Sequence, residues 1–385
     1  MSNERLDQLI EELNATTKAQ RLQALREIKL LVDQGVVPQP IRGVDVNNHI
    51  HSIYSFSPYS PTKAVFRSWE SGLTTTGIMD HDSISGAKEF IEAGRILGMP
   101  TTVGAELRVS FAGTRLEGRR MNNPDQVTVT YIALHGIPHT AIAELAQFFA
   151  PISQARGVRN RAMLARINEL LTKAGVSVDY DEDVLPISMA HEGGSVTERH
   201  LLFAVATKLT ARFGRGAELV NFLEQSLGLP VSGKTGEYLL DAANENYEYD
   251  LLNVLKGNLV EQFYIPATDE VPHVSEVSTL AEKLGIILAY PYLGDIAESV
   301  TGDKKAQLFE DVFLDEVFDT IRDEQFKAVT YMPSRNTPAQ LERLRALCEQ
   351  YEFFQISGED INQPRQKFIC EAMRKPEFSN LYDAA

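Results

Sequence analysis

The sequence predicts an α/β protein built on a parallel barrel, with a mostly helical inserted cap domain and a helical N-terminal extension. Seven short apolar stretches are typical of strands, and most of them alternate with segments of helical periodicity. A long helical stretch, from about residue 140 to about 270, interrupts this alternation. We therefore expect an extension at 1–42, a barrel formed by 43–139 and 271–385, and a cap at 140–270.

The N-terminal part has apolar residues at helical spacing between positions 4 and 33, and Gly35, Pro38 and Pro40 end the pattern. We expect this extension to pack on the barrel; a helix that binds a partner is the alternative. The first residues, MSNERLDQLIEELN, lack the apolar core of a signal peptide. No apolar run approaches the roughly 18 residues of a membrane span. Cys348 and Cys370 fit a reducing compartment, so we expect a cytoplasmic protein without membrane partners.

The expected strands follow one another at fairly regular intervals on either side of the insertion. In chain order they are GVDVNNH (43–49), TTTGIMDHD (74–82), MPTTVGAEL (99–107), VTVTYIALH (127–135), IILAYP (286–291), KAVTYMP (327–333) and FFQISGED (353–360). Helices are expected after the cap signal at Ser60 and Pro61, at 84–98, at 304–325, and after the capping box that Thr337 begins.

The formal net charge is −16, from 37 Lys+Arg against 53 Asp+Glu. Such a balance repels polyanions and argues against broad nucleic-acid binding. It leaves room for a local basic pocket that holds one phosphate group.

Histidines and acids gather where the predicted strands end. They are His49 and His51, then Asp80, His81 and Asp82, then Glu106, His135, Glu359 and Asp360. The carboxyl ends of barrel strands meet at one face, and four of the eight histidines fall at these ends. Strand alternation sends His49 and His51 to the same side.

Imidazoles and carboxylates together suit Zn, Mn or Fe, so the pattern predicts a centre with one to three divalent ions. Asp80 is a candidate partner for the other ring nitrogen of His81. Taken singly, the signals have other interpretations, since Asp82 can cap a helix and Glu106 can be a solvated strand end. Their combination favours the metal centre.

Several stretches resemble, in order, the motifs of the PHP (polymerase and histidinol phosphatase) family. They are HIHS, GIMDHDSISGAKEF, VGAEL, TERHLLFAVA, IILAYP and YMPSRNTPAQ…FFQISGEDIN, and they span residues 43 to about 370. The resemblance implies a distorted (β/α)7 TIM-like barrel with a two- or three-metal centre at its C-terminal face. It also implies hydrolysis of phosphoesters, as in the histidinol phosphatase-like members.

The match to the family's metal ligands is incomplete. His49, His51, His81, Glu106 and Asp360 coincide with family ligands, and His135 matches if the ligand has moved two positions from Ala133. Phe56 stands in place of an aspartate, Tyr290 and Asn362 in place of histidines, and Asn47 where an aspartate is common. Fewer ligands imply a specialised centre or a weakened one.

A phosphoester substrate needs cations and N–H donors beside the metals. Arg199 and His200, at the start of a predicted helix, are expected to form a phosphate cradle; pairing of Arg199 with a carboxylate is the alternative. His200 or a metal-bound water is the expected proton donor to the leaving group. Arg335 follows a strand end, and Tyr290 and Asn362 add hydrogen-bonding groups for the substrate. Four arginines (156, 159, 161 and 166) are expected to form a solvated helix face; contact with an anionic ligand is the alternative.

The leading hypothesis is a metal-dependent hydrolase of a small phosphate monoester, a nucleotide or an oligonucleotide end. The alternative is a catalytically weakened barrel that binds a metal or a phosphorylated ligand as a sensor or scaffold. A third possibility, hydrolysis of a C–N bond, lacks a lysine motif at a strand end to support it.

Overall fold

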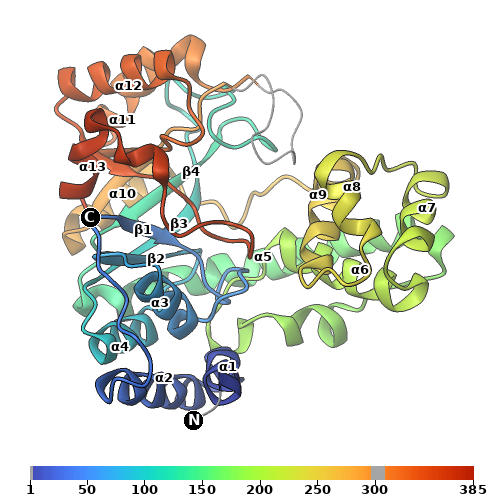
Figure 1. Ribbon diagram of the computed structural model, residues 1–385. Coiled ribbons are helices and arrows are strands. Elements are labelled where there is room, and N and C mark those ends of the chain that lie inside the picture. The colour runs from blue at the N-terminus through green and yellow to red at the C-terminus, as the bar shows by residue number, and fades with distance from the viewer. Residues whose placement is uncertain (1–2, 296–307) are drawn as a thin grey trace.

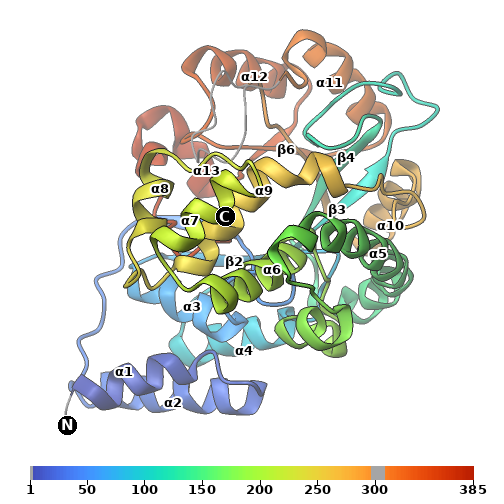
Figure 2. The same ribbon diagram turned by 90° about the vertical axis from the view of Figure 1, so that its right-hand side faces the viewer.

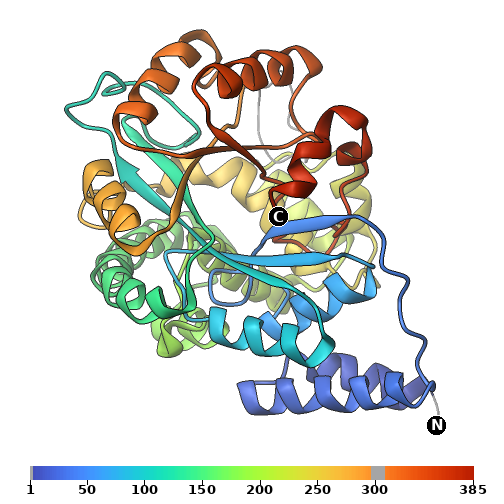
Figure 3. The same ribbon diagram turned by 90° about the vertical axis from the view of Figure 1, so that its left-hand side faces the viewer.

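The computed structural model describes residues 3–295 and 308–385. Seven strands form one curled sheet, in the order β1 to β7, and each lies where the sequence predicts it (Figure 3). The strands are β1 Val46–Ile50, β2 Thr75–His81, β3 Thr101–Ser110, β4 Val129–His135, β5 Ile287–Pro291, β6 Ala328–Tyr331 and β7 Phe354–Ser357.

The direction of β4 corrects the expectation of a wholly parallel barrel. This strand runs antiparallel to both β3 and β5, whereas the other neighbouring strands are parallel. Residues 111–128, between β3 and β4, contain no helix, and a parallel connection needs a crossover, usually helical. The reversal brings the C-terminal end of β4 toward the edge of the sheet at which the parallel strands begin.

The first strand of the sheet is linked to the segment that follows the last strand. Ile50 and Ile361 form a parallel bridge: the His51 N–H donates to the Ile361 carbonyl (2.9 Å), and the Ile361 N–H donates to the His49 carbonyl (3.0 Å). The two edges of the curled sheet are therefore bridged beside the predicted metal ligands His49 and His51.

Helices pack around the sheet over one large apolar core. They are α3 Pro61–Glu70, α4 Ala87–Leu97, α10 Val274–Leu284, α11 Leu314–Asp323, α12 Pro338–Gln350 and α13 Ser379–Asp383. The predicted caps are confirmed, because the side chains of Ser60 and Thr337 accept from Lys63 N–H and Gln340 N–H respectively. The helix predicted at 304–325 is present as α11 in its second half; its first residues, 304–307, lie outside the described part of the chain.

The N-terminal extension consists of two helices, α1 Asn3–Glu12 and α2 Lys18–Asp33, which lie against α3 and α4 below the sheet (Figure 1). A buried ion pair joins α2 to α4, with Arg21 Nη2 2.6 Å from Glu89 Oε2. Because an unpaired buried charge is costly, this pair fixes where the extension docks.

Between β4 and β5 lies a helical segment, residues 142–263. Its helices are α5 Ile142–Leu170, α6 Glu198–Phe213, α7 Ala217–Gln225, α8 Gly233–Leu240 and α9 Tyr247–Phe263, with short turns η1 to η5 among and before them. Helices α6 to α9 form a lobe beside the sheet in Figure 1 and in front of it in Figure 2. The segment has an apolar core of its own.

Helix α5 belongs to both cores. Leu145 and Phe149, in its first half, pack in the core of the sheet, and Leu164 and Ile167, in its second half, pack in the core of the segment. Its 29 residues span about 44 Å at 1.5 Å per residue. Among the described residues, no helix combines the length and apolar character needed to cross a membrane.

Candidate metal centre

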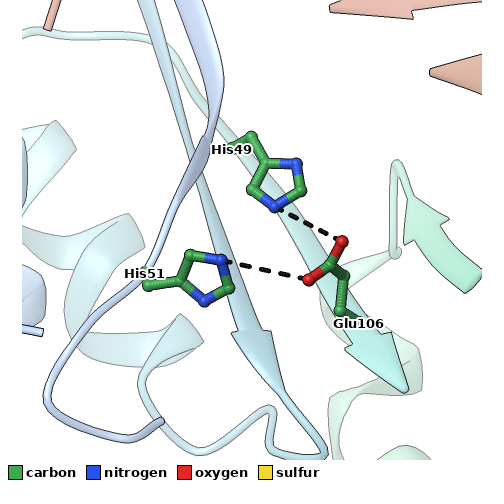
Figure 4. A group of neighbouring side chains, drawn as sticks. All are labelled: His49, His51 and Glu106. Atoms are coloured by element: carbon green, nitrogen blue, oxygen red, sulfur yellow. Dashed lines mark ion pairs between the residues drawn. The ribbon is translucent and has the colours of Figure 1, made fainter. Parts of the chain in front are cut away.

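Three side chains from β1 and β3 converge inside the curled sheet. His49 Nε2 lies 3.5 Å from Glu106 Oε1, and His51 Nε2 lies 4.0 Å from Glu106 Oε2 (Figure 4). All three residues are buried, and each offers a ligand atom within 4.8 Å of the others. Strand alternation predicts this convergence, since His49 and His51 are two positions apart.

His81 and Asp360 extend this group. His81 is level with Glu106 in the β2–β3 register, and its Nδ1 lies 3.3 Å from Glu106 Oε2. Asp360, just after β7, has Oδ1 3.2 Å from His51 Nε2. Three of the predicted ligands thus surround the Glu106 carboxylate, and Asp360 joins the group through His51.

His135, the sixth, lies on the same inner face but deeper. Ala133 pairs with Glu106, so the next residue on that face of β4 is His135. Burial first, and then the nearby His49, lower the pKa of His135 to about 3. We expected His135 at the C-terminal end of a parallel strand. Because β4 is antiparallel, its C-terminal end lies at the opposite edge of the sheet from the other strand ends.

Several buried polar atoms of this group have no hydrogen-bond partner within the described residues. They are His51 Nε2, His81 Nδ1, His135 Nε2 and Asp360 Oδ1. Buried polar atoms are nearly always satisfied, so a cluster of unsatisfied nitrogen and oxygen atoms fits a bound cation. The donor set therefore suits a divalent metal ion.

The charge states of Glu106 and His81 agree with this interpretation, whereas for His51 burial is outweighed by Asp360 and Glu106, which raise its pKa in the metal-free protein. Burial would raise the pKa of Glu106, but His49 and the other imidazoles outweigh it and lower that pKa to about 2. Burial, with His51 nearby, lowers the pKa of His81 to about 3. At neutral pH the group therefore offers an anionic carboxylate and a neutral imidazole, the forms that bind metals.

We expected Asp80 to support His81. In the structure it supports His51 instead, through Ser55. Its carboxylate accepts hydrogen bonds from the Ser52 N–H (2.7 Å), the Ser52 hydroxyl (2.7 Å) and the Ser55 hydroxyl (2.6 Å). The Ser55 hydroxyl lies 3.3 Å from His51 Nδ1. Neighbouring residues on a strand point to opposite faces, which keeps Asp80 from the ring of His81.

Arg199 and Asn362 form a chain that ends on Asp360. The Arg199 guanidinium donates to Asn362 Oδ1 (3.1 Å), and Asn362 Nδ2 donates to Asp360 Oδ2 (2.5 Å). Both residues line the same cavity as the metal ligands. Asn362, predicted to contact substrate, thus also holds a candidate ligand.

Two predicted residues are placed away from the chemistry. His200 Nδ1 accepts from the Thr197 N–H (3.0 Å) in a helix cap, and burial lowers the pKa of His200 to about 3, so it is a poor proton donor. Tyr290 is fully buried in the sheet's outer core, where burial and then Glu310 raise its pKa. It faces away from Ala289, which lies on the inner side with Ala133.

A cavity of about 410 Å³ opens onto the centre, within the range of small-ligand sites. Its lining includes the predicted Arg199 and Arg335 and several residues that the sequence did not single out: Arg108, Tyr131, Lys256 and Tyr264. Arg335 Nε donates to the Leu293 carbonyl (3.2 Å). Arg108 had a usable signal, since it lies two positions after Glu106 and so on the same strand face.

Buried charges join the helical segment to the barrel. Glu270 accepts from Arg108 (2.5 Å), Arg156 (3.1 Å) and Arg159 (2.8 Å), and Arg159 also reaches Glu198 (2.6 Å). Arg156 and Arg159 are therefore buried, and the expected solvated face is wrong for them. Arg161 and Arg166 do lie at the surface.

The fold is similar to that of two solved structures. A protein of Bifidobacterium adolescentis, provisionally assigned as a metal-dependent phosphoesterase, superposes with a TM-score of 0.54 at 18% identity, covering 86% of this chain and 90% of that one. An amidohydrolase of Chromobacterium violaceum, with bound sulfate and no metal, gives 0.55 at 16% identity, covering 84% and 89%. At these identities the likeness establishes the fold, and it is consistent with the divergent PHP-like barrel that the motifs resemble.

Sequence relatives match over shorter stretches. An error-prone DNA polymerase of Nocardia farcinica is 31% identical over 118 residues, 28% of this chain and 10% of that protein. A 5'-3' exoribonuclease of Haemophilus influenzae is 28% identical over 152 residues, 40% of this chain and 47% of that protein. The chain thus spans a tenth and about half of the lengths of these two curated relatives. No family model matches the chain.

Proposed function

We propose that the protein is a metal-dependent phosphoesterase of the PHP type that acts on a small phosphorylated substrate. The observation that carries the proposal is the group of buried, unsatisfied ligand atoms around Glu106 at one end of the cavity. The shared fold and the partial sequence matches, which include an exoribonuclease, support it.

His49, His51, His81, Glu106 and Asp360 would hold the ions, with His135 as a deeper ligand. Zn, Mn and Fe all suit these donors, and one to three ions per chain fit their number. When bound, such ions lower the pKa of a water and polarise a phosphoryl oxygen.

The chain's own cations would bind the phosphate. Arg199, from α6, and Arg335, from the turn after β6, both line the cavity. A guanidinium donates paired hydrogen bonds to phosphoryl oxygens, so these residues can orient the ester for attack. Tyr131, whose ring centre lies 5.7 Å from that of His81, keeps its proton because burial raises its pKa, and can donate a hydrogen bond.

The helical segment would act as a cap over the barrel formed by residues 43–139 and 271–385. Residues from α6 and α9 line the cavity together with strand-end residues, so the segment limits the size of the substrate. The net charge of −16 favours a small substrate over a long nucleic acid, and two free cysteines fit a cytoplasmic location.

The test is metal content together with phosphatase activity. Protein purified without added metal is analysed for its elements, then assayed on a panel of phosphate esters, beside His81→Ala and the exposed control His139→Ala. Bound ions and activity that are lost in His81→Ala alone support the proposal. Bound metal without hydrolysis would favour the sensor or scaffold, and no metal after incubation with Mn and Zn would refute the assignment.

A further inference from the structure

Each of three loops that carry or follow candidate metal ligands contacts the helical segment. The loops follow β1, β2 and β7, and they carry Phe56, Asp82 and Asn362 respectively. Each of these residues is within five positions of a candidate ligand. We propose that the helical segment positions the ligand loops, so that the affinity for metal depends on contacts made by Arg156, Arg199 and Phe56. The inference rests on the proposed metal centre.

The first contact is between Asp82 and Arg156. Asp82 follows His81 directly, its N–H donates to the Glu106 carbonyl (2.7 Å), and its backbone has a φ of 47°. A residue other than glycine rarely adopts this left-handed conformation unless its surroundings enforce it. The Asp82 carboxylate pairs with Arg156 of α5, and both side chains are buried. Arg156 therefore holds the turn that orients His81.

The second contact is the chain from Arg199 to Asp360. Asn362 spans the distance between them, donating to Asp360 and accepting from Arg199 of α6. An outer partner of this kind fixes the direction of a ligating carboxylate. Without Arg199, the side-chain amide of Asn362 would lose one of its two partners and would hold the Asp360 carboxylate less firmly.

The third contact is apolar. Phe56 follows the Ser52 and Ser55 hydroxyls that support His51 and Asp80, and it has a φ of 89°. Its ring belongs to the core of the helical segment, with ring centres 5.0 Å from His200 and 5.6 Å from Phe203. Burial of the ring offsets the cost of the left-handed backbone, roughly 1–2 kcal/mol.

Together the three contacts give the segment a task besides covering the cavity. Ordinary packing between two cores would be satisfied by apolar contacts alone. Here the buried ion pair between Arg156 and Asp82 lies one residue from His81. The hydrogen-bonded chain from Arg199 ends on Asp360 itself.

The test measures metal affinity directly. Metal-free wild type, Arg199→Gln, Asp82→Asn and the control Arg161→Gln are titrated with Mn²⁺ by isothermal calorimetry, with circular dichroism to check folding. Arg161 is the matched control because it makes an ion pair from the outward face of α5, 2.6 Å from Asp181. Arg199→Gln changes a half-buried residue on the cavity wall. It leaves the buried ion pairs of Glu270 with Arg108, Arg156 and Arg159 intact.

Loss of an outer partner typically weakens metal binding by about 10–100-fold, and we expect this for both site variants but not for the control. A change of less than about fivefold in either variant would overturn the inference, while tight binding by the wild type would leave the proposed function standing. A wild type that binds no ion would overturn both. By reciprocity, Mn²⁺ should also slow hydrogen exchange in α5 and α6 of the wild type.

Discussion

At the scale of the residue, Glu106 is the side chain around which the three nearest histidines lie. His49 and His81 lie within 3.5 Å of its two oxygens, and His51 lies slightly farther away. With a pKa of about 2, the carboxylate is ionised throughout the neutral range.

We predict that Glu106→Gln weakens metal binding by more than about 100-fold, because an amide oxygen carries no charge to offset that of the ion. Elemental analysis and calorimetric titration would measure the change. Glu282→Gln, at an exposed position of α10, is the control and should bind metal like the wild type. Equal affinity in both variants would place the ion elsewhere.

Glu310 allows a prediction about pH. It is fully buried and accepts from the Leu293 N–H (2.8 Å), and burial raises its pKa to about 7. The folded state therefore binds a proton more tightly than the unfolded state, so stability falls as the pH rises from about 4.5 to about 7. Glu310→Gln removes this loss and should stabilise the protein by up to roughly 3 kcal/mol at pH 8, with little effect below pH 4.5.

Urea denaturation at the two pH values would measure this difference. Glu371→Gln, at an exposed position, controls for the lost charge; because it keeps Glu310, its stability should fall between the two pH values as that of the wild type does. A Glu310→Gln variant that is less stable than the wild type at pH 8 would contradict the assignment of a costly buried charge.

How far the sequence predicts the site depends on the residue. His49, His51, His81, Glu106 and Asp360 follow from strand ends and alternation, which are local properties. Asp80 was expected beside His81 and His200 was expected to donate a proton to the leaving group. Their observed hydrogen bonds to Ser55 and Thr197 depend on how the loops and caps turn, which the sequence does not show.

At the scale of the element, the positions of the strands were predictable and the direction of β4 was not. Apolar runs and turn residues mark where a strand lies, but pairing direction depends on the connection. Residues 111–128, with no helical periodicity, were the available signal for an antiparallel pair. The burial of Arg156 and Arg159 was also not predictable from the sequence, because their partner Glu270 lies more than 100 positions away.

Glu270 joins β3 and α5 to the chain that precedes α10. Three guanidinium groups donate to its carboxylate, so Glu270→Gln leaves buried positive charge without compensation. We predict a loss of about 3–5 kcal/mol in the free energy of unfolding, measured by urea denaturation. Glu276→Gln, near the start of α10 at an exposed position, should lose far less. A small loss at Glu270 would mean that water reaches the network.

At the scale of the whole molecule, the metal centre and the stability of the fold should be coupled. The candidate ligands lie on or just after β1, β2, β3, β4 and β7, and an unfolded chain cannot bring them together. An ion that binds only the folded state stabilises it by about 2.7 kcal/mol at 100 times its Kd.

We therefore predict that a chelator lowers the midpoint of thermal unfolding and that added Mn²⁺ or Zn²⁺ restores it, as measured by calorimetry. The His51→Ala variant should respond to neither treatment. An unchanged midpoint in the wild type would mean that no ion is bound at the concentrations tested.

The bridge between Ile50 and Ile361 has a consequence for how the protein is made. Asn47 of β1 and Glu359, just after β7, are 312 positions apart, yet they are hydrogen-bonded beside the centre. The ribosome releases the first strand long before the last. His49 and His51 are therefore exposed before Asp360 has been synthesised. During synthesis the complete ligand set therefore appears only when nearly the whole described chain is available, and metal capture through Asp360 would mark the end of assembly.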